Sequence, residues 1–566
     1  MVSRLWPLVL GILYSTTALA ELEITIYYPR TASEKEYSSY SIDTVPPDEL
    51  NTVSSLNNLT SGPKGQMTST FLRGTNSNHT LLTFNGVPIK DGSTPTGTDD
   101  IGQHNFLGID YANVIKGPMS HKYGADAIGG VIDLRSQPNT ENSITLSGGS
   151  NNQFSQTYKI GKMVNDTIID FRYKNDKSDS ISVLDDGEND PYANKDYSLQ
   201  TETYLNGASL KTAFLKTNNT SHLDTAGSIP NYTSKWNFEN VYVSYQTKKG
   251  ELTFNNASHK RLYNKDGDTD TYNSDRSSII SNYTFSFGTT DLTFNNELEQ
   301  VDVDFDTNIN GYNSEVTKKR FNTGHSISIA KDFNDTIVSG GFRLDNPDTF
   351  DEQYTGRVGL YHNGFRASYS TGFKAPTLYE MYGSDNYGFV GNRDLEPEKS
   401  KTVEVGYRNK IFDFALYRTT LDNTLTYQWP TYINDKKKNI RKGAELGLTY
   451  DIGSVKIRNN LTWTQAEDGN GKQVTRRPRW QNNTQLSYDI FTLDLNYFGK
   501  HLDIHSSTYE TIEMQDKLIL NLSAKKDILG LTFFGRFSNI TDVDYERPHG
   551  YNQLGRNFEL GFSKRF

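Results

Sequence analysis

The sequence contains no cysteine, so disulfide bonds, thiolate metal sites and cysteine nucleophiles are all excluded. Its formal net charge of −10 at pH 7 gives no support to nucleic-acid binding, which needs an excess of lysine and arginine. After residue 20, no apolar run is long enough to form a transmembrane helix. Serines and histidines follow no recognisable nucleophile pattern, so we expect no enzyme activity and no catalytic residue or cofactor.

The first 20 residues have the form of a secretory signal. Arg4 precedes an apolar run from Leu5 to Tyr14, and Ala18-Leu19-Ala20 supplies the small residues of a cleavage site. The apolar run is too short to span a membrane as an anchor. We therefore interpret residues 1–20 as a signal peptide.

The remaining composition combines low hydropathy with many aromatic residues. The mean hydropathy is −0.67, yet the chain contains 29 Phe and 35 Tyr. A transmembrane β-barrel reconciles the two values, because each strand alternates lipid-facing apolar residues with polar residues that face the lumen. Its aromatic girdles at both membrane interfaces also use many Phe and Tyr side chains.

Residues 139–566 alternate with a period of two between short polar turns. One example is Val403, Val405 and Tyr407, which alternate with Thr402 and Glu404. At about 20 residues per strand and connection, this length predicts a barrel of about 22 antiparallel strands. A large soluble β-sandwich or propeller is the rival reading, but we find no repeat of about 40–50 residues with a fixed signature. The aromatic final segment, RNFELGFSKRF, favours the barrel.

Residues 40–138 differ from the barrel region, because they are rich in glycine and their apolar runs are shorter. A barrel of 22 strands has a wide lumen, which transporters of this size fill with a plug. We therefore expect residues 40–138 to form an N-terminal α/β plug domain inside the lumen of the barrel at 139–566.

Five blocks of sequence resemble those of TonB-dependent outer-membrane receptors, in the order found in that family. The plug blocks are FLRGTNSNHTLLTFNGVPI (71–89) and VIKGPMSHKYGADAIGGVIDLRS (114–136). The barrel blocks are STGFKAPTLYEMYG (370–383), GNRDLEPEKSKTVEVGY (391–407) and NITDVDYERPHGYNQLGRNFELGF (539–562). The resemblance implies a monomeric, multi-pass protein of the bacterial outer membrane, in contact with its lipid.

The resemblance also implies a TonB box in the segment 21–39. The family pairs a short extended stretch here with the TonB complex of the inner membrane, and β-strand addition would provide the contact. An ordinary first plug strand is the alternative. The expected TonB-binding residues are Leu22, Glu23, Ile24, Thr25, Ile26 and Tyr27.

Two plug arginines, Arg73 and Arg135, are expected to pair with carboxylates of the plug or the barrel wall, rather than to lie in solvent. The chain also departs from the family pattern. Residues 52–60 occupy the place of a helix that usually ends in Pro-Gly-Val, and that motif is missing.

The residues of these blocks most resemble those of cobalamin (vitamin B12) transporters, so we expect a TonB-dependent importer of cobalamin. A ferric-siderophore receptor is the alternative. A haem receptor is disfavoured because residues 364–401 contain no histidine, and a secreted all-β enzyme is the weakest reading. The expected substrate-binding residues are Ser61, Gly62, Gln66, Asp91, Ser93, Thr94, Thr96, Tyr379 and Tyr382, although the two tyrosines could instead belong to the interfacial girdle.

An acidic stretch at residues 175–197 has the carboxylate density that suits calcium. The resemblance to cobalamin transporters implies Ca²⁺ in an extracellular loop near this place, and a solvated acidic loop is the alternative. The candidate ligands are Asp179, Asp185, Asp186, Glu188, Asp190 and Asp196. A second acidic row, Asp302, Asp304 and Asp306, is expected to face the lumen or to lie at the base of a loop.

Overall fold

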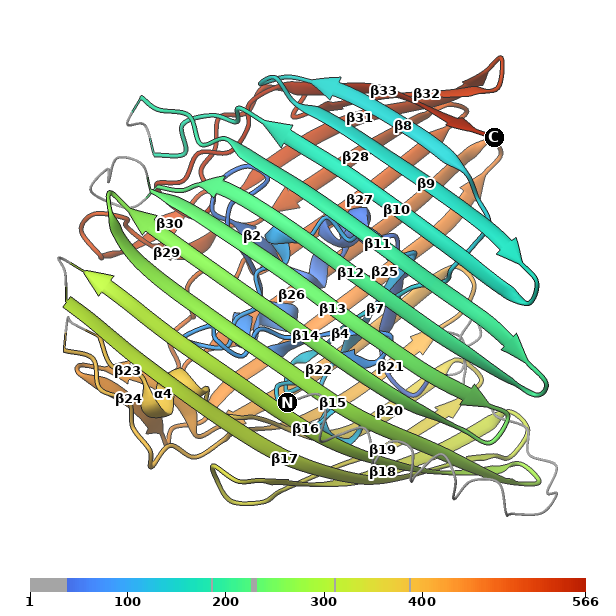
Figure 1. Cartoon of the computed structure of the whole chain (residues 1–566), viewed down its shortest axis with the longest axis vertical. Coiled ribbons are helices and arrows are strands. Elements are labelled where there is room, and N and C mark those ends of the chain that lie inside the picture. The colour runs from blue at the N-terminus through green and yellow to red at the C-terminus, as the bar shows by residue number, and fades with distance from the viewer. Residues whose placement is uncertain (1–37, 185–186, 225–231, 310–311, 386–387) are drawn as a thin grey trace.

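The computed structural model describes residues 38–184, 187–224, 232–309, 312–385 and 388–566. A plug fills the lumen of a closed β-barrel (Figure 1). Within the described residues, no helix has the length and apolar character needed to cross a membrane.

The plug is built on a five-stranded sheet in the order β1-β6-β7-β4-β5. Its strands are β1 (Ile42–Val45), β4 (Thr80–Phe84), β5 (Val87–Pro88), β6 (Tyr111–Lys116) and β7 (Gly130–Arg135). The pair β4–β7 is parallel, and the other pairs are antiparallel. Both faces of β4 are buried, since the sheet is covered by plug segments and by the barrel wall.

Short elements complete the plug. A hairpin is formed by β2 (Asn58–Thr60) and β3 (Thr68–Thr70). The one described α-helix of the plug is a single turn, α3 (Ser120–Tyr123). The 3-10 turns are η2 (Pro47–Thr52), η3 (Ser54–Leu56), η4 (Leu72–Gly74), η5 (Ser77–His79) and η6 (Ile101–Gln103). The stretch at 52–60, where the resemblance implied a departure from the family pattern, holds the 3-10 turn η3 and the strand β2 rather than an α-helix.

Twenty-two antiparallel strands close the barrel, which confirms the predicted strand count. Closure is made by β33 pairing with β8. The strands are β8 (Ser143–Gly149), β9 (Phe154–Val164), β10 (Thr167–Ser178), β11 (Tyr192–Leu205), β12 (Ala208–His222), β13 (Thr233–Thr247), β14 (Gly250–Lys265), β15 (Asp268–Phe287), β16 (Thr290–Ile309), β17 (Tyr312–Asp332), β18 (Thr336–Pro347), β19 (Gln353–His362), β20 (Phe365–Lys374), β21 (Glu398–Arg408), β22 (Phe412–Asp422), β25 (Asn439–Ile452), β26 (Val455–Glu467), β27 (Trp480–Tyr488), β28 (Phe491–Phe498), β31 (Lys517–Ile528), β32 (Leu531–Ser538) and β33 (Asn557–Arg565).

The two ends of the barrel differ in the length of their connections. One end has turns of two or three residues, such as those at 165–166 and 489–490, whereas the other has longer loops, such as those at 375–397 and 539–556. These longer loops hold α4 (Leu378–Tyr382) and the hairpins of β23 (Thr424–Gln428) with β24 (Thr431–Asp435) and of β29 (His501–Ile504) with β30 (Thr511–Met514). Transmembrane barrels have short periplasmic turns and longer extracellular loops, so the loop end is extracellular.

The wall alternates as the sequence predicts. Val403 and Val405 are 54% and 47% exposed on the lipid side, whereas Thr402 and Glu404 are buried against the plug. The acidic row on β16 occupies the second of the two positions expected for it, the base of a loop rather than the lumen. Val301, Val303 and Phe305 face the lumen and are buried, so Asp302, Asp304 and Asp306 point outward at the base of the extracellular loop.

Candidate functional site

A chain of aromatic side chains lines the inner wall at the extracellular end. Tyr263 of β14 and Tyr272 of β15 have ring centroids 6.0 Å apart, and Tyr272 is 6.0 Å from Phe305 of β16. Phe305 in turn meets Tyr379 of α4 edge to face at 5.3 Å. Four aromatic residues from three strands and one loop helix therefore form a continuous surface above the plug.

The same surface continues across the loops. Tyr379 stacks on Phe389 at 5.0 Å, and Phe389 meets Tyr432 of β24 at 5.8 Å. The helix α4 is held by a capping box, in which Thr377 accepts a hydrogen bond from the backbone of Glu380. We call this group the aromatic mouth; its members are Tyr263, Tyr272, Phe305, Tyr379, Tyr382, Phe389, Tyr427 and Tyr432. Phe305 and Phe389 are buried beneath it, whereas its tyrosines keep exposed surface.

Cationic side chains lie over rings at this mouth. The guanidinium of Arg261 is 5.2 Å from the centroid of Tyr272. Lys318 and Arg393 both lie 5.4 Å from the ring of Tyr382. Flat rings beside positive charges favour an anionic ligand that itself contains aromatic rings.

Two of the expected substrate residues, Tyr379 and Tyr382, therefore lie at the mouth, and both keep exposed surface. The sequence analysis missed the other rings of the mouth. Their signal was present, since Tyr263, Tyr272 and Phe305 occupy inward positions of the wall alternation near the extracellular ends of their strands. Finding them required knowledge of which face points inward.

The expected plug residues at 91–96 lie in the loop below the mouth. Asp91 pairs with Arg261 at 2.9 Å, and this cation holds the pKa of Asp91 below its usual range although burial opposes the shift. Ser93 is fully buried and donates to Asp91 at 2.6 Å. Thr94 is also buried, whereas Thr96 is partly exposed. The side chains of Asp91 and Ser93 thus serve plug–wall contact rather than facing the mouth.

The expected residues at 61–66 lie at the tip of the hairpin formed by β2 and β3. Gln66 is buried and donates to the backbone oxygen of His222 at 2.7 Å. Gly62 is buried against Val183 of an extracellular loop, and Ser61 keeps part of its surface exposed. Of these three residues, Ser61 has the side chain that remains most open to the extracellular side.

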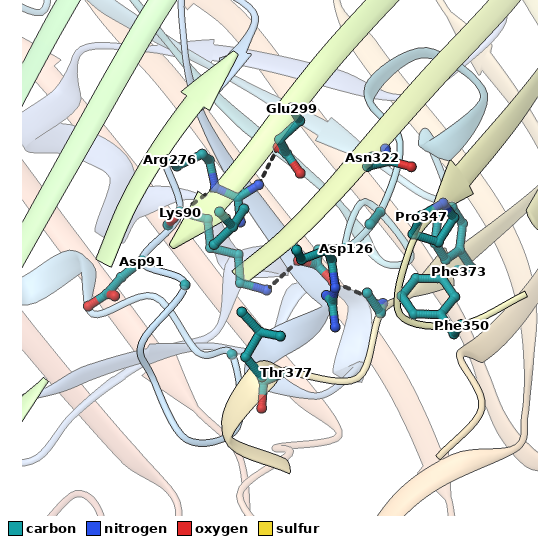
Figure 2. Close-up of a pocket in the computed structure, with 17 residues that line it drawn as sticks. Lys90, Asp91, Asp126, Arg276, Glu299, Asn322, Pro347, Phe350, Phe373 and Thr377 are labelled. Carbon is teal, nitrogen blue, oxygen red and sulfur yellow. Dashed lines mark hydrogen bonds and ion pairs between the residues drawn. The ribbon is translucent and has the colours of Figure 1, made fainter. Parts of the chain in front are cut away.

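A small cavity of about 50 Å³ separates the plug loop from β15, β16 and β17 (Figure 2). Lys90 of the plug forms an ion pair with Asp126 at 3.0 Å, and Arg276 of the wall pairs with Glu299. Arg276 also donates to the backbone oxygen of Lys90 at 3.2 Å. These contacts fix the plug loop below the aromatic mouth.

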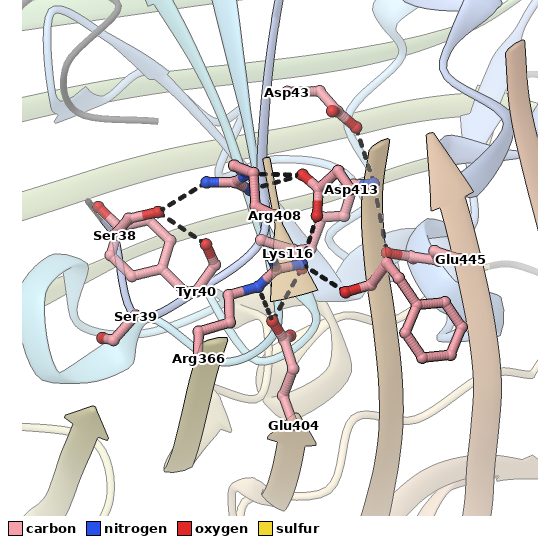
Figure 3. A network of polar contacts seen from close by, with 12 residues as sticks. Ser38, Ser39, Tyr40, Asp43, Lys116, Arg366, Glu404, Arg408, Asp413 and Glu445 are labelled. Carbon is pink, nitrogen blue, oxygen red and sulfur yellow. Dashed lines mark hydrogen bonds and ion pairs between the residues drawn. The ribbon is translucent and has the colours of Figure 1, made fainter. Parts of the chain in front are cut away.

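A second polar network joins the plug to the wall nearer the periplasm (Figure 3). Arg73 of the plug pairs with Glu404 at 2.6 Å and with Glu445 at 2.9 Å. These pairs confirm the prediction that Arg73 meets carboxylates of the plug or the barrel wall. Burial would lower the pKa of Arg73, but the two carboxylates hold it well above its ordinary value. Lys116 bridges Glu445 and Asp43 at 3.3 and 2.7 Å. Arg135, the other predicted arginine, pairs with a plug carboxylate, Asp133, at 2.5 Å.

The first described residues of the plug belong to this network. Ser41 donates to Glu404 at 2.8 Å, and Arg408 donates to Ser38 at 3.3 Å. Arg408 lies beside the short turn at 409–411, so Ser38 is at the periplasmic end. The expected TonB-binding residues Leu22, Glu23, Ile24, Thr25, Ile26 and Tyr27 lie outside the described residues and remain a prediction.

The expected calcium ligands do not come together where the structure describes them. Asp179 and Glu188 are exposed, whereas Asp190 and Asp196 are buried. Asp196 accepts hydrogen bonds from Asn105 of the plug and from Thr217. Among the described residues, no three His, Cys, Asp or Glu side chains form a metal-binding group. Asp185 and Asp186 lie outside those residues, so calcium binding remains a prediction.

Comparisons with known proteins agree with this architecture. A model of the TonB-dependent receptor-like β-barrel matches residues 139–540, and a model of the TonB-dependent receptor plug domain matches residues 35–131. Three solved structures have the same fold at 14–16% identity.

The ferric enterobactin receptor PfeA from Pseudomonas aeruginosa aligns with a TM-score of 0.76 at 16% identity, over 93% of this chain and 99% of that one. The siderophore receptor PirA from Acinetobacter baumannii has a TM-score of 0.76 at 14% identity, over 96% and 100%. The copper transporter OprC has a TM-score of 0.78 at 14% identity, over 94% and 98%. With its matched barrel and plug, the chain belongs to the TonB-dependent receptor family of outer-membrane transporters.

Proposed function

We propose that this transporter binds a ferric siderophore at the aromatic mouth and imports it. The observation that supports the proposal most is the pairing of rings with cations at Tyr382, because Lys318 and Arg393 both lie over its ring. The charge of Arg261 beside Tyr272 is offset by its ion pair with Asp91. A ferric catecholate combines aromatic rings with net negative charge, so it matches both features of the surface.

Cobalamin, the substrate expected from the sequence, has less support than this alternative. The solved relatives described above are a ferric enterobactin receptor, a siderophore receptor and a copper transporter. Their identities of 14–16% support the fold rather than the ligand, so the proposal depends on the aromatic mouth. A neutral corrinoid would also make little use of the cations there.

The proposed import begins when the ligand settles on the mouth and the loops close over it. The TonB protein then adds Leu22–Tyr27 to its own sheet edge and pulls, using the proton gradient of the inner membrane. The plug segment that follows, from Ser38, is bonded to the Arg73 network, so the pull acts on the contacts that hold the plug.

The test is equilibrium binding by the purified full chain, followed by uptake in cells that depend on it. Ferric enterobactin, a ferric hydroxamate and cyanocobalamin serve as probes, each with and without a calcium chelator. Saturable binding of the ferric catecholate alone is the expected result, and binding of cyanocobalamin alone would overturn the proposal. Deleting Leu22–Tyr27 should abolish uptake and preserve surface binding; unchanged uptake would contradict the role given to this segment.

A further inference from the structure

Arg547 lies in the extracellular loop at 539–556 and reaches the plug. Its Nη2 donates to Oδ1 of Asn57 at 2.9 Å, and its guanidinium lies 3.8 Å from the ring centroid of Phe498. In the described part of the chain, Nε of Arg547 is buried and has no hydrogen-bond partner. The side chain is thus held between the plug and the wall with part of its donor capacity unused.

Arg547 also lacks a counter-charge. Among the described residues, no carboxylate oxygen lies within 4.0 Å of its nitrogens, whereas Arg73 at the same plug–wall interface has two such partners. Burial lowers the pKa of Arg547 to about 10, and Tyr545 is the group that opposes this shift. Arg547 keeps part of its surface exposed, but a desolvated cation without an anion is costly, so a bound anion would stabilise this arrangement.

A cavity of about 150 Å³ adjoins this guanidinium. Its lining is dominated by amides and hydroxyls, and it includes no Asp or Glu. Most of its amide N–H groups already donate within the protein, as those of Asn57, Asn483 and Gln553 do. The side-chain N–H groups of Gln481 and Asn496 are the ones left to turn toward a guest among the described residues that line the cavity. One cation among neutral donors is the composition expected of an oxyanion site rather than of a cation site.

We infer that this cavity binds a carboxylate or phosphate group, with Arg547 as the charged partner and the amides of Gln481 and Asn496 as hydrogen-bond donors. The volume admits one such group together with water. Binding at this cavity does not depend on the ligand proposed for the mouth, because inorganic phosphate alone can test it.

The proposed anion site adjoins a larger cavity between the plug and the barrel wall. A larger cavity of about 930 Å³ shares Thr60, Asn483 and Asn496 with it. This larger space follows the wall from the plug hairpin down to Ser487 and Thr492, which flank a periplasmic turn. An anion at Arg547 would therefore lie beside a polar gap that runs along most of the barrel.

The experiment measures the melting temperature of the full chain in detergent, with phosphate or citrate added at constant ionic strength against chloride. Phosphate stands for a free small anion, and citrate stands for a ligand that bears carboxylates. We expect at least one of them to raise the melting temperature by about 2 °C or more at 20 mM. Arg547→Gln should lose this response.

Arg536→Gln is the matched control, since Arg536 lines the larger cavity near Asp494 and its replacement should leave the response intact.

A second variant covers the case in which Arg547→Gln does not fold. Asn496 accepts from Asn483 at 2.6 Å, so Asn496→Asp keeps that bond and adds a fixed negative charge. It should melt higher than the unmodified chain without added anion and gain nothing from phosphate or citrate. No response in the unmodified chain, or an equal response in Arg547→Gln or Asn496→Asp, would overturn the inference.

Discussion

Arg73 of the plug donates two hydrogen bonds to the carboxylate of Glu445 in the barrel wall, from Nε and Nη2, each 2.9 Å long. Glu404 takes a third bond from the same guanidinium at 2.6 Å. All three side chains are buried, so this ion-pair cluster holds the plug to β21 and β25 without competition from water.

Replacing Arg73 with alanine should weaken the plug strongly, because the buried Glu404 and Glu445 then keep only the longer contacts to Arg366, at 3.4 Å, and to Lys116, at 3.3 Å. The expected loss is about 3–5 kcal/mol in the free energy of plug unfolding. Urea titration monitored by protease cleavage within the plug measures it. The exposed pair Lys436–Glu396 provides the control, and Lys436→Ala should change stability by less than about 1 kcal/mol. Equal effects of the two variants would refute the structural role of Arg73.

Gly130→Ala should also destabilise the plug. Gly130 has φ +152°, and a β-carbon there would collide with the backbone oxygen of Ile115 and with Leu72. We expect a cost of about 2 kcal/mol or more, measured by the same urea titration. Gly148→Ala is the control, since the nearest atom to its new carbon would be 3.5 Å away. An unchanged free energy of plug unfolding in Gly130→Ala would show that the backbone of the plug sheet can shift to accommodate the new carbon.

The stability of the plug should depend on pH through His104, which packs against Trp236 and Phe238. Burial lowers the pKa of His104 from its ordinary value of 6.5 to about 3. The unfolded chain therefore binds a proton before the folded one does, and stability from this residue is lost as pH falls from 6.5 towards 3. His104→Phe removes the ionisation, so its advantage in melting temperature over the unmodified chain should grow in that window.

The slope from one such proton is at most about 1.4 kcal/mol per pH unit. Above pH 7 the difference between the two proteins should be constant. A difference that stays constant down to pH 4 would mean that His104 is not kept neutral by its surroundings.

Tyr379→Ala should weaken ligand binding at the aromatic mouth, because Tyr379 contacts both Phe305 and Phe389. Loss of one stacked ring predicts an affinity about tenfold lower for ferric enterobactin by isothermal titration. Tyr509 lies 78% exposed in a different loop, so Tyr509→Ala should bind as the unmodified chain does. An unchanged affinity in Tyr379→Ala would place the ligand elsewhere.

The barrel could be predicted because the alternation of apolar and polar residues within each strand shows that the strand has two different faces. The alternation at Val403 and Val405 needs no information from distant residues, and the length of the region then fixes the strand number. The alternation does not say which face is inner once both are polar or mixed. For that reason the sequence leaves two positions open for Asp302, the lumen or the base of a loop, and the fold shows that Val303 is the residue buried in the lumen.

The site depends on contacts that alternation cannot supply. Arg73 and Glu445 are 372 positions apart, and only closure of the barrel around the plug brings them together. The pairing of Asp91 with Arg261 is of the same kind, so a loop that looked free to meet a ligand is bonded to the wall. The sequence predicts that a buried arginine pairs with a carboxylate. Which carboxylate it meets could be known only from the fold.

The pairing of β33 with β8 also imposes an order on biosynthesis. Leu560 lies opposite Gly148, so one edge of the earliest barrel strand has no neighbour until the final strand has been translated and delivered to the membrane. An unpaired edge is a template for wrong association. The edge of β8 must therefore be kept from pairing with another strand until β33 reaches it.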